Sequence, residues 1–250
     1  MTDKSLSSLS RMLSVLDLFS DNQTTWTAEG ITEALQVSLP TGYRYVKMLV
    51  DAGLLQRAAD SHYTLGPRII VLDHYIRLAD PVLAHGIPFM QELVEHTGFD
   101  CVLSGLYGHQ VLDTHREFGK APALLSYGRG RPRPLFLGAA PKAILSCFAP
   151  AQLHKVLDQN LDEVKAAGLP TEWSDFRKYF SAIRKAGYYF SNGELESNLA
   201  AVAAPLQKAD GSILGAISLV TSVQRMAVMD MGQLTQLLIR AAQDITSRIP

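Results

Sequence analysis

The sequence has few cysteines and no long apolar run. Cys101 and Cys147 are its two cysteines, and neither belongs to a CxxC pair or to a run of cysteines and histidines. This spacing gives no support to a disulfide framework or a zinc site, so we expect both thiols to be ordinary small buried side chains. No segment approaches the roughly 18 to 20 uninterrupted apolar residues of a membrane span, and the N-terminus MTDKSLSSLS lacks the apolar segment of a signal peptide. We therefore expect a cytoplasmic protein with no membrane contact.

Common catalytic motifs are also missing. The sequence contains no GxSxG elbow, no HExxH, no P-loop and no GxGxxG. A metal or acid/base cluster could be imagined from His109, Asp113 and His115, but they share a strand face only if the hairpin around them is regular, and there is no fourth partner. We favour surface or hairpin roles for them and expect no catalytic residue, no cofactor and no metal.

Positive charge is scarce as well. The formal net charge is -1, and residues 1–66 carry five basic against seven acidic side chains. Any affinity of this segment for nucleic acid must therefore come from where its charges lie rather than from their sum.

What is abundant is apolar sequence. Apolar side chains make up 47% of the 250 residues, which is enough to bury the core of one large domain or two ordinary ones. We expect a folded α+β protein with an N-terminal unit over 1–66, a linker helix over 67–79 and a larger C-terminal domain over 80–250.

The first 66 residues carry the pattern of a winged helix-turn-helix. Apolar residues every three or four positions predict a helix over 7–19. Thr27 is a plausible N-cap for a second helix that ends near Gln36, and Pro40 opens a third, which Gly53 stops after Ala52. Short strands over 54–58 and 62–65, joined by AADS, form a hairpin where a wing belongs.

The third helix is the expected DNA reader. At about 100° per residue we place Tyr43, Val46 and Val50 on its packed side, with Thr41, Arg44, Tyr45 and Met48 facing out. Arg44 can donate two hydrogen bonds to guanine, and Lys47 suits a phosphate. Gly42 lets the helix backbone come close to a neighbour. The full candidate set for DNA is Ser38, Pro40, Thr41, Tyr43, Arg44, Tyr45, Lys47, Arg57 and His62. The alternative is a helical packing unit that makes protein contacts.

The segments that follow indicate an oligomer and a sensor. The helix over 67–79 has apolar residues on too many sides for one wing domain to cover, so we expect a partner subunit against it. Beyond Asp80 we predict helices over 82–97, 140–148, 151–158, 172–186 and 229–247. Strands are predicted over 99–107, 110–116, 121–127, 187–191, 199–207 and 213–221. Strands joined by tight turns favour a largely antiparallel sheet with helices around it.

The run RGRP at 129–132 matches the core of an AT-hook, which inserts arginines into a narrow minor groove. Here it lies between a strand and a helix with apolar flanks rather than in a basic tail. We favour a loop constrained by Pro132 and Pro134, whose Arg129, Arg131 and Arg133 are solvated or attract an anionic effector, and we keep minor-groove binding as the alternative.

Several segments together resemble one family. RMLSVLDLF, TAEGITEALQVSLPTGYRYVKMLVDAGLLQR and YTLGPRI resemble the DNA-binding half of IclR-type (isocitrate lyase regulator) proteins, while GRGRPRPLFLGAAPKAIL, GYYFSNGELESNLAAVAAPL and GAISLV resemble their effector half. The resemblance spans nearly the whole chain. It implies a winged helix-turn-helix, a dimerising linker helix and a GAF-like domain for small organic acids, in homodimers or dimers of dimers that bind operator DNA and often regulate catabolic genes.

Departures from the family pattern fall in the effector half. Phe136 stands where the family usually has His, and Pro141 stands in place of Gly, although Lys142 remains. Ser191 and Asn192 replace the usual paired acids, and Ala200 and Ala201 replace the usual Arg-Cys pair. The extra room hints at a bulkier ligand such as an aromatic acid, and no relative's effector can be transferred directly.

We expect the effector in a pocket between the sheet and the helix that starts after Gly138, because unpaired N–H groups at a helix start favour a carboxylate. The candidate residues are Leu124, Tyr127, Phe136, Gly138, Ala139, Ala201 and Ser218, several of them by the resemblance; the aromatic ones could equally fill the core. The sequence thus predicts an effector-controlled transcriptional repressor or activator and not an enzyme. The alternative is an enzyme with a GAF-like domain and a helical N-terminal adaptor.

Overall fold

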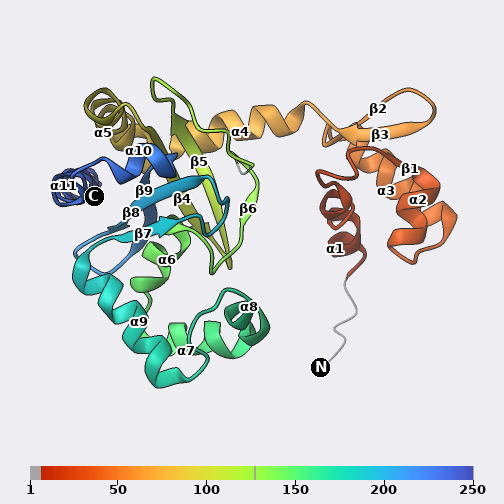
Figure 1. Cartoon of the computed structure of the whole chain (residues 1–250). Helices are drawn as coiled ribbons and strands as arrows, with labels where there is room; N and C mark the ends of the chain where they lie inside the picture. Colours follow the sequence, from red (N-terminus) through yellow and green to blue (C-terminus); the bar gives the residue numbers. More distant parts are fainter. Residues whose placement is uncertain (1–6, 127, 250) are drawn as a thin grey trace. The chain divides into compact units, whose positions relative to one another are not determined.

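The computed structural model describes residues 7–126 and 128–249. The chain forms two compact units, which divide between Asp80 and Pro81 (Figure 1). Within the described residues, none of the helices combines the length and the apolar character needed to cross a membrane.

The N-terminal unit is a helix-turn-helix followed by a hairpin. Its elements are α1 (Ser8–Leu13), η1 (Leu16–Leu18), β1 (Trp26–Thr27), α2 (Ala28–Ala34), α3 (Leu39–Asp51), β2 (Leu55–Arg57), β3 (His62–Leu65) and α4 (Arg68–Ala79). The three short strands are antiparallel in the order β1-β3-β2. The sequence pattern predicted this order of helices and the hairpin, but it did not predict β1.

The predicted helix over 7–19 is shorter in the structure. It ends as α1 at Leu13, and a single 3-10 turn follows. The hydroxyl of Ser14 donates to the carbonyl of Arg11 at 2.9 Å, and such side-chain bonds compete with helix continuation. The predicted caps of the next helices are confirmed: Thr27 accepts from the N–H of Gly30, and Gly53 adopts a φ of 73° after α3.

Helices α2 and α3 approach each other closely at one point. A Cβ on Gly42 would lie 2.0 Å from Oγ1 of Thr32, so no larger residue fits here without a shift. Thr32 is buried, and its hydroxyl donates to the carbonyl of Ala28. The expectation that Gly42 permits a close backbone approach is therefore confirmed.

Helix α4 contrasts with the packed helices of this unit. None of its side chains is buried, although most are apolar. Ile70, Tyr75 and Leu78 are 73%, 59% and 72% exposed. In the described chain these side chains lie open to solvent around the helix rather than along one stripe.

The C-terminal unit is built on an antiparallel sheet with the strand order β6-β5-β4-β9-β8-β7. The strands are β4 (Asp100–Tyr107), β5 (Gln110–Glu117), β6 (Pro132–Arg133), β7 (Tyr189–Asn192), β8 (Leu199–Gln207) and β9 (Ile213–Ser222). The helices are α5 (Pro81–Thr97), α6 (Ala139–Ser146), α7 (Pro150–Gln159), α8 (Leu161–Ala166), α9 (Trp173–Ala186), α10 (Val223–Ala227) and α11 (Met231–Ser247).

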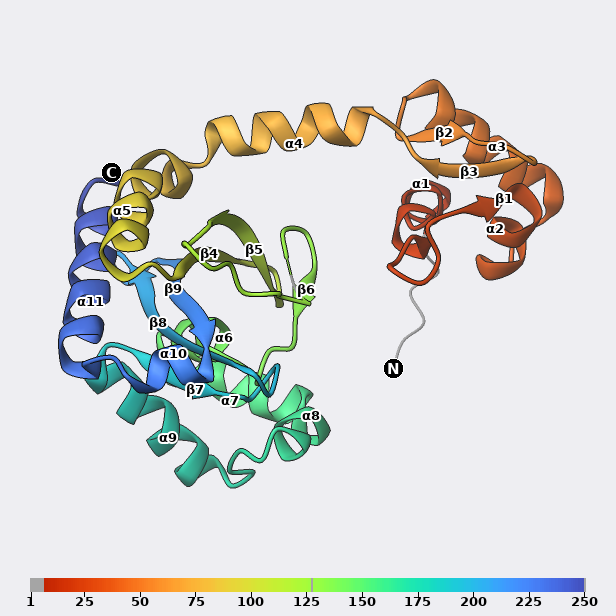
Figure 2. The same cartoon turned by 45° about the horizontal axis from the view of Figure 1, so that its top comes forward.

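The two faces of this sheet are covered differently. Helices α5 and α11 pack on one face over a core that includes Leu103, Val202 and Ile217, and α6 packs on the other (Figure 1, Figure 2). Helices α7, α8 and α9 form a further apolar cluster around Phe176 and Phe180. The α+β architecture with an antiparallel sheet agrees with the sequence-based prediction.

One predicted strand is wrong. The described part of the predicted segment 121–127 contains no strand. Strand β6 forms later in the chain, at 132–133. The cause is Asp100, whose buried carboxylate accepts from the N–H of Gly119 at 2.6 Å and of Ala123 at 2.7 Å. These side-chain bonds take the place of a strand ladder, and Pro122 has no N–H to donate to one. The short helices α8 and α10 were also not predicted.

Candidate nucleic-acid interface and ligand pocket

The exposed face of α3 carries most of the predicted DNA-reading residues. Arg44 and Lys47 are exposed, and Thr41 is half-buried. Ser38 occupies the N-cap position without a capping bond from its side chain, and its hydroxyl lies 2.9 Å from that of Thr41. Ser38 and Thr41 thus present two hydroxyls near the start of α3. Further along the helix, Arg44 presents a guanidinium and Lys47 an ammonium.

The predicted orientation of the two tyrosines of α3 is wrong. Tyr45 is 3% exposed and hydrogen-bonds through its hydroxyl to Ser8 at 2.9 Å, whereas Tyr43 is 47% exposed. The buried stripe runs through Gly42, Tyr45, Val46 and Leu49. Because Gly42 has no side chain, the apolar pattern did not reveal that the stripe begins there. Tyr45 is thus a core residue of the domain, and Tyr43 takes its place on the exposed face.

Tyr43 links α3 to α2. Its hydroxyl donates to the carboxylate of Glu29, and this bond raises the pKa of Tyr43 and lowers that of Glu29. The exposed face of α3 therefore has an acidic neighbour, Glu29, beside its cations.

The hairpin supplies the remaining candidates. Arg57 is exposed on β2, next to the turn. The turn contains Asp60 and Ser61 with φ of 52° and 59°, as a tight hairpin turn requires. Nδ1 of His62 lies 2.9 Å from the carbonyl of Asp60, so this ring is held within the turn.

The C-terminal unit has a cavity between its sheet and the start of α6. It encloses about 410 Å³ of space between atoms, part of it open to solvent. Its lining consists of Leu125, Arg133, Gly138, Ala139, Ser191, Leu195, Glu196, Leu199, Ala200, Ala201 and Val220. Three predicted effector residues, Gly138, Ala139 and Ala201, lie on this wall.

The other predicted effector residues lie elsewhere. Leu124 is 88% exposed, and Phe136 is buried in the apolar cluster of α7, α8 and α9. Ser218 is buried in the sheet, where its hydroxyl donates to the carbonyl of Val102 at 3.3 Å. These three placements correct the sequence-based set, and Tyr127 lies outside the described residues.

The start of α6 is capped by a carboxylate of the protein itself. Gly138 is the N-cap, with a φ of 85°, and its N–H donates to Oε2 of Glu194 at 3.1 Å. The same oxygen accepts from Nζ of Lys142, a buried lysine, at 2.6 Å. Lys142 also lies 3.1 Å from the hydroxyl of Tyr189, which donates to Oε1 of Glu194 at 2.7 Å.

Tyr189 extends this network toward α9. It accepts from the hydroxyl of Tyr179 at 2.9 Å. Burial is the largest cause that raises the pKa of Tyr189, followed by its hydrogen bonds with Tyr179 and Glu194. Tyr189 is therefore a neutral phenol that fixes the position of Glu194.

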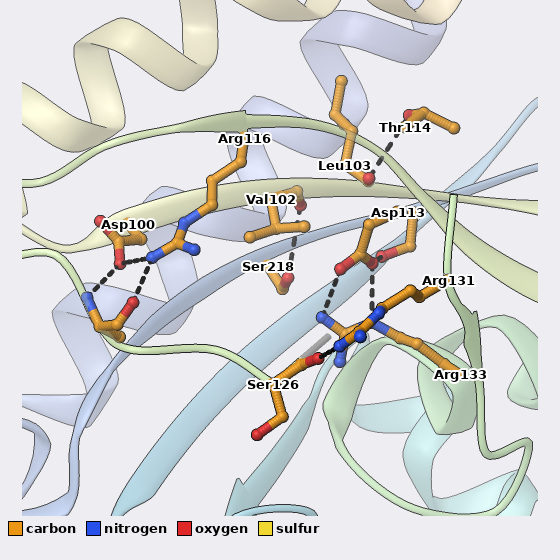
Figure 3. A network of polar contacts seen from close by, with 12 residues as sticks. Asp100, Val102, Leu103, Asp113, Thr114, Arg116, Ser126, Arg131, Arg133 and Ser218 are labelled. Atoms are coloured by element: carbon orange, nitrogen blue, oxygen red, sulfur yellow. Dashed lines mark hydrogen bonds and ion pairs between the residues drawn. The ribbon is translucent and has the colours of Figure 1, made fainter. Parts of the chain in front are cut away.

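A second ion pair lies at the other wall of the cavity. Arg133 of β6 donates through Nε and one Nη to the two oxygens of Asp113, at 2.7 Å and 2.6 Å (Figure 3). Asp113 also accepts from the hydroxyl of Ser104 at 2.8 Å. Both side chains are largely buried, with 9% and 4% exposed.

Residues 118–131, which we call the strap, connect β5 to β6. Asp100, bonded also to Arg116, fixes the strap's first turn (Figure 3). Arg129 donates to the carbonyl of Thr114, and Arg131 to that of Ser126. The expectation that these arginines belong to a constrained loop is confirmed, but Arg133 is not solvated. The side chains of Arg131 and Arg133 both bond to residues of their own domain. The arginines of an AT-hook in a basic tail are instead free to enter the minor groove.

The imagined cluster of His109, Asp113 and His115 is not assembled. Asp113 faces Ser104 and Arg133, and Nε2 of His115 lies 2.8 Å from Glu117. No group of three or more potential metal-ligating side chains occurs in the described parts of the chain.

The sequence reasoning named Arg133 and Ser191 without placing them in the cavity. It missed Leu125, Leu195, Glu196, Leu199 and Val220. Alternation along β9 was available as a signal for Val220, but Leu195 and Glu196 lie in the turn after β7, where no periodicity applies.

Comparisons with known proteins agree across the chain. The model of the IclR helix-turn-helix domain matches residues 8–59, and the model of the bacterial transcriptional regulator IclR C-terminal domain matches residues 79–247. The regulator XynR of Escherichia coli is 23% identical over 88% of each chain.

Solved structures show the same fold. A putative IclR transcriptional regulator from a Silicibacter species superposes with a TM-score of 0.79 at 23% identity, over 97% of this chain and 96% of the other. An IclR homologue from Microbacterium hydrocarbonoxydans, complexed with 4-hydroxybenzoate, gives a TM-score of 0.74 at 20% identity, over 97% and 99%.

Proposed function

Since the chain belongs to the IclR family of bacterial transcriptional regulators, whose members bind DNA and are not enzymes, we propose that a small organic acid controls its binding to an operator. We further propose that residues 1–66 read the DNA, that α4 links and dimerises, and that residues 80–250 bind the acid. Catabolic genes are the proposed targets.

The DNA-reading role is supported by the exposed face of α3. Arg44 and Lys47 project from the middle of this helix, and Ser38, Thr41 and Tyr43 lie near its start. Recognition helices contact base edges with their N-terminal residues, so Arg44 suits a guanine and Lys47 a phosphate. Arg57 and His62 on the hairpin suit the sugar-phosphate backbone.

The observation that carries the effector role is the cavity at the start of α6. Its walls are mainly apolar and carry a few polar groups, as the walls of ligand pockets do. The N–H of Ala139 has no hydrogen-bond partner among the described residues, and it lies at the positive end of the helix. The complex of the Microbacterium homologue with 4-hydroxybenzoate supports an organic acid as the ligand.

The dimer is supported by α4. Apolar side chains exposed all around a helix rarely stay in water, and a palindromic operator needs two readers. We propose that a second copy of the chain covers this helix. The assembly is then a homodimer or a dimer of dimers.

The test uses the purified full-length protein and its genomic DNA. Footprinting should find a palindromic site near genes for acid catabolism, and a panel of aliphatic and aromatic acids should include one that changes affinity for this site. Ala139→Asp places a negative charge beside the proposed carboxylate position, so it should abolish the response to the acid while DNA binding remains. Absence of sequence-specific duplex binding would refute the DNA-reading role, and an unchanged response in Ala139→Asp would refute the pocket.

A further inference from the structure

A groove lies beside the end of α6 in the C-terminal unit. Its walls come from the turn between β4 and β5, the turn between β8 and β9, the segment that joins α6 to α7, and one side chain of α9. Its volume is about 750 Å³, within the range of roughly 300 to 1,000 Å³ that ligand pockets occupy. We propose that this groove is a second binding site, which takes a small amphipathic anion with an acidic head and an apolar body.

The groove is separate from the proposed effector cavity. Strands β4 and β9 are antiparallel, with Ser104 opposite Ala216, so the end of β4 and the start of β9 lie at the same end of the sheet. There the two turns meet Phe148, which follows α6, whereas Ala139 at the start of α6 lines the effector cavity. The eight residues of α6 span about 12 Å, and the two sites share no lining residue.

The charges that line the groove have one sign. None of the described residues in its lining is acidic, although the chain has 24 acidic and 23 basic residues. Lys155 of α7 and Arg184 of α9 supply positive charge, and His109 of the turn between β4 and β5 adds an imidazole. Lys155 is exposed and forms no ion pair or hydrogen bond within the described parts of the chain. A cleft lined by charge of one sign concentrates ions of the opposite sign.

Acidic residues beside the groove already have partners. On α7, Asp158 lies 2.9 Å from Nδ1 of His154. In the turn between β8 and β9, Asp210 accepts from the N–H of Ser212 at 2.8 Å and lies 3.8 Å from Nζ of Lys208. Lys155 and Arg184 therefore remain available to an anion that enters the groove.

Arg184 is held in place at the wall. Its Nε and one Nη donate to the carbonyls of Ser146 and Phe148 at the end of α6. Its other Nη has no partner among the residues that the structure describes. A guanidinium fixed in this way still has N–H groups to donate, so an acidic head can bond to it without reordering the side chain.

The groove also offers apolar surface. Leu106, Phe148 and Ile213 line it from three different elements, and each is only half-buried. Val156 of α7 lines it as well. An apolar body that covers these side chains removes their exposed surface from water, which favours binding. The ligand therefore needs an apolar part as well as an anionic head.

The test measures dissociation constants of three probes by calorimetry on the full-length Ala139→Asp protein, in which a negative charge blocks the proposed effector cavity. The probes are octanoate, octan-1-ol and acetate. We expect octanoate to bind about tenfold more tightly than octan-1-ol, as a charge-assisted hydrogen bond implies. Octanoate should exceed acetate by at least about tenfold, which burial of about two methylene groups suffices to give. The wild type should bind octanoate at the groove with the same affinity.

Two charge substitutions locate the head. Lys155→Glu on α7 and His109→Glu on the turn between β4 and β5 should each weaken octanoate binding about tenfold and leave octan-1-ol unchanged, because each places a carboxylate in the groove. Lys185→Glu is the matched control, since Lys185 is exposed next to Arg184 but does not line the groove. Circular dichroism and sedimentation verify that each variant keeps its fold and its assembly.

The outcomes separate this site from the proposed effector role. A selective loss of octanoate binding in Lys155→Glu and His109→Glu supports the groove, whether or not any acid changes DNA binding. Equal losses in Lys185→Glu, equal affinities for octanoate and octan-1-ol, or no octanoate binding in the Ala139→Asp protein would overturn it. Dissociation of the oligomer by Lys155→Glu would also overturn it, because the groove would then be an interface between subunits.

Discussion

Glu194 and Lys142 form an ion pair at the start of α6, with Oε2 and Nζ 2.6 Å apart. The lysine side chain is 4% exposed and that of the glutamate 21%. An ammonium this deeply buried needs a counter-charge, and Glu194 supplies it while it also accepts from the N–H of Gly138. The turn after β7, which carries Glu194 and lines the cavity with Leu195 and Glu196, is thereby tied to the helix opposite it.

We expect Glu194→Gln to lower the free energy of unfolding by about 3 kcal/mol, because it leaves the Lys142 ammonium buried without a charge partner. Urea denaturation of the full-length protein measures this loss. In a Lys142→Met background the same substitution should cost much less, since no charge remains to be orphaned. Additive losses in this double-mutant cycle would contradict the coupling.

Gly42→Ala should destabilise the N-terminal unit by about 2 kcal/mol, as overpacking does, because its Cβ would lie 2.0 Å from Oγ1 of Thr32. The change should also weaken DNA binding, since α3 must move away from α2. Thermal unfolding and fluorescence anisotropy with operator DNA measure the two effects. Adding Thr32→Ala removes the nearest atom and should restore part of both. A fully stable Gly42→Ala protein would show that the α2–α3 contact is looser than described.

Arg44→Ala should cost about 1 to 3 kcal/mol of binding free energy on the specific operator and relax the base preference at one position. Lys47→Ala should weaken binding to all duplexes alike and reduce the slope of log affinity against log salt by about one unit. Anisotropy titrations on an operator and a scrambled duplex over a salt series separate these roles. Full affinity and unchanged base preference in Arg44→Ala would remove its assignment.

The sequence predicted those features that depend on local patterns. Thr27, Pro40 and Gly53 mark the ends of α2 and α3 because caps and stops act within a few residues. Which side of α3 is buried was harder to predict. Tyr43 and Tyr45 are only two residues apart on this helix, and the buried stripe includes Gly42, whose missing side chain hid where the stripe begins.

Long-range contacts could not be predicted. The resemblance and the helix-start argument located Gly138 and Ala139 on the cavity wall. The pairs of Arg133 with Asp113 and of Lys142 with Glu194 join residues 20 and 52 positions apart. No periodicity in the sequence encodes such pairs, and the strap was mistaken for a strand because Asp100 bonds its backbone from a distance.

Leu78→Glu should convert the protein to a monomer if α4 is the dimer interface, because it buries a charge in an apolar contact. Sedimentation at micromolar concentration should show a dimer or larger for the wild type and a monomer for the variant. His74→Glu, also on an exposed position of α4, tests whether any added charge has this effect. An unchanged sedimentation coefficient in Leu78→Glu would place the interface elsewhere.

The stability of the C-terminal unit should fall at alkaline pH because of Cys101. This thiol is fully buried on β4, and burial raises its pKa, helped by the nearby carboxylates of Glu117 and Asp100. The folded state therefore keeps the proton that the unfolded state loses above its ordinary pKa of about 8.5. Stability from this group is complete below that pH and declines above it by about 1.4 kcal/mol per pH unit. Urea denaturation between pH 8 and pH 10 should show a shallower decline in the free energy of unfolding for Cys101→Ala than for the wild type. Equal declines would mean that the thiol has the same protonation state in the folded and the unfolded protein, which would contradict this prediction.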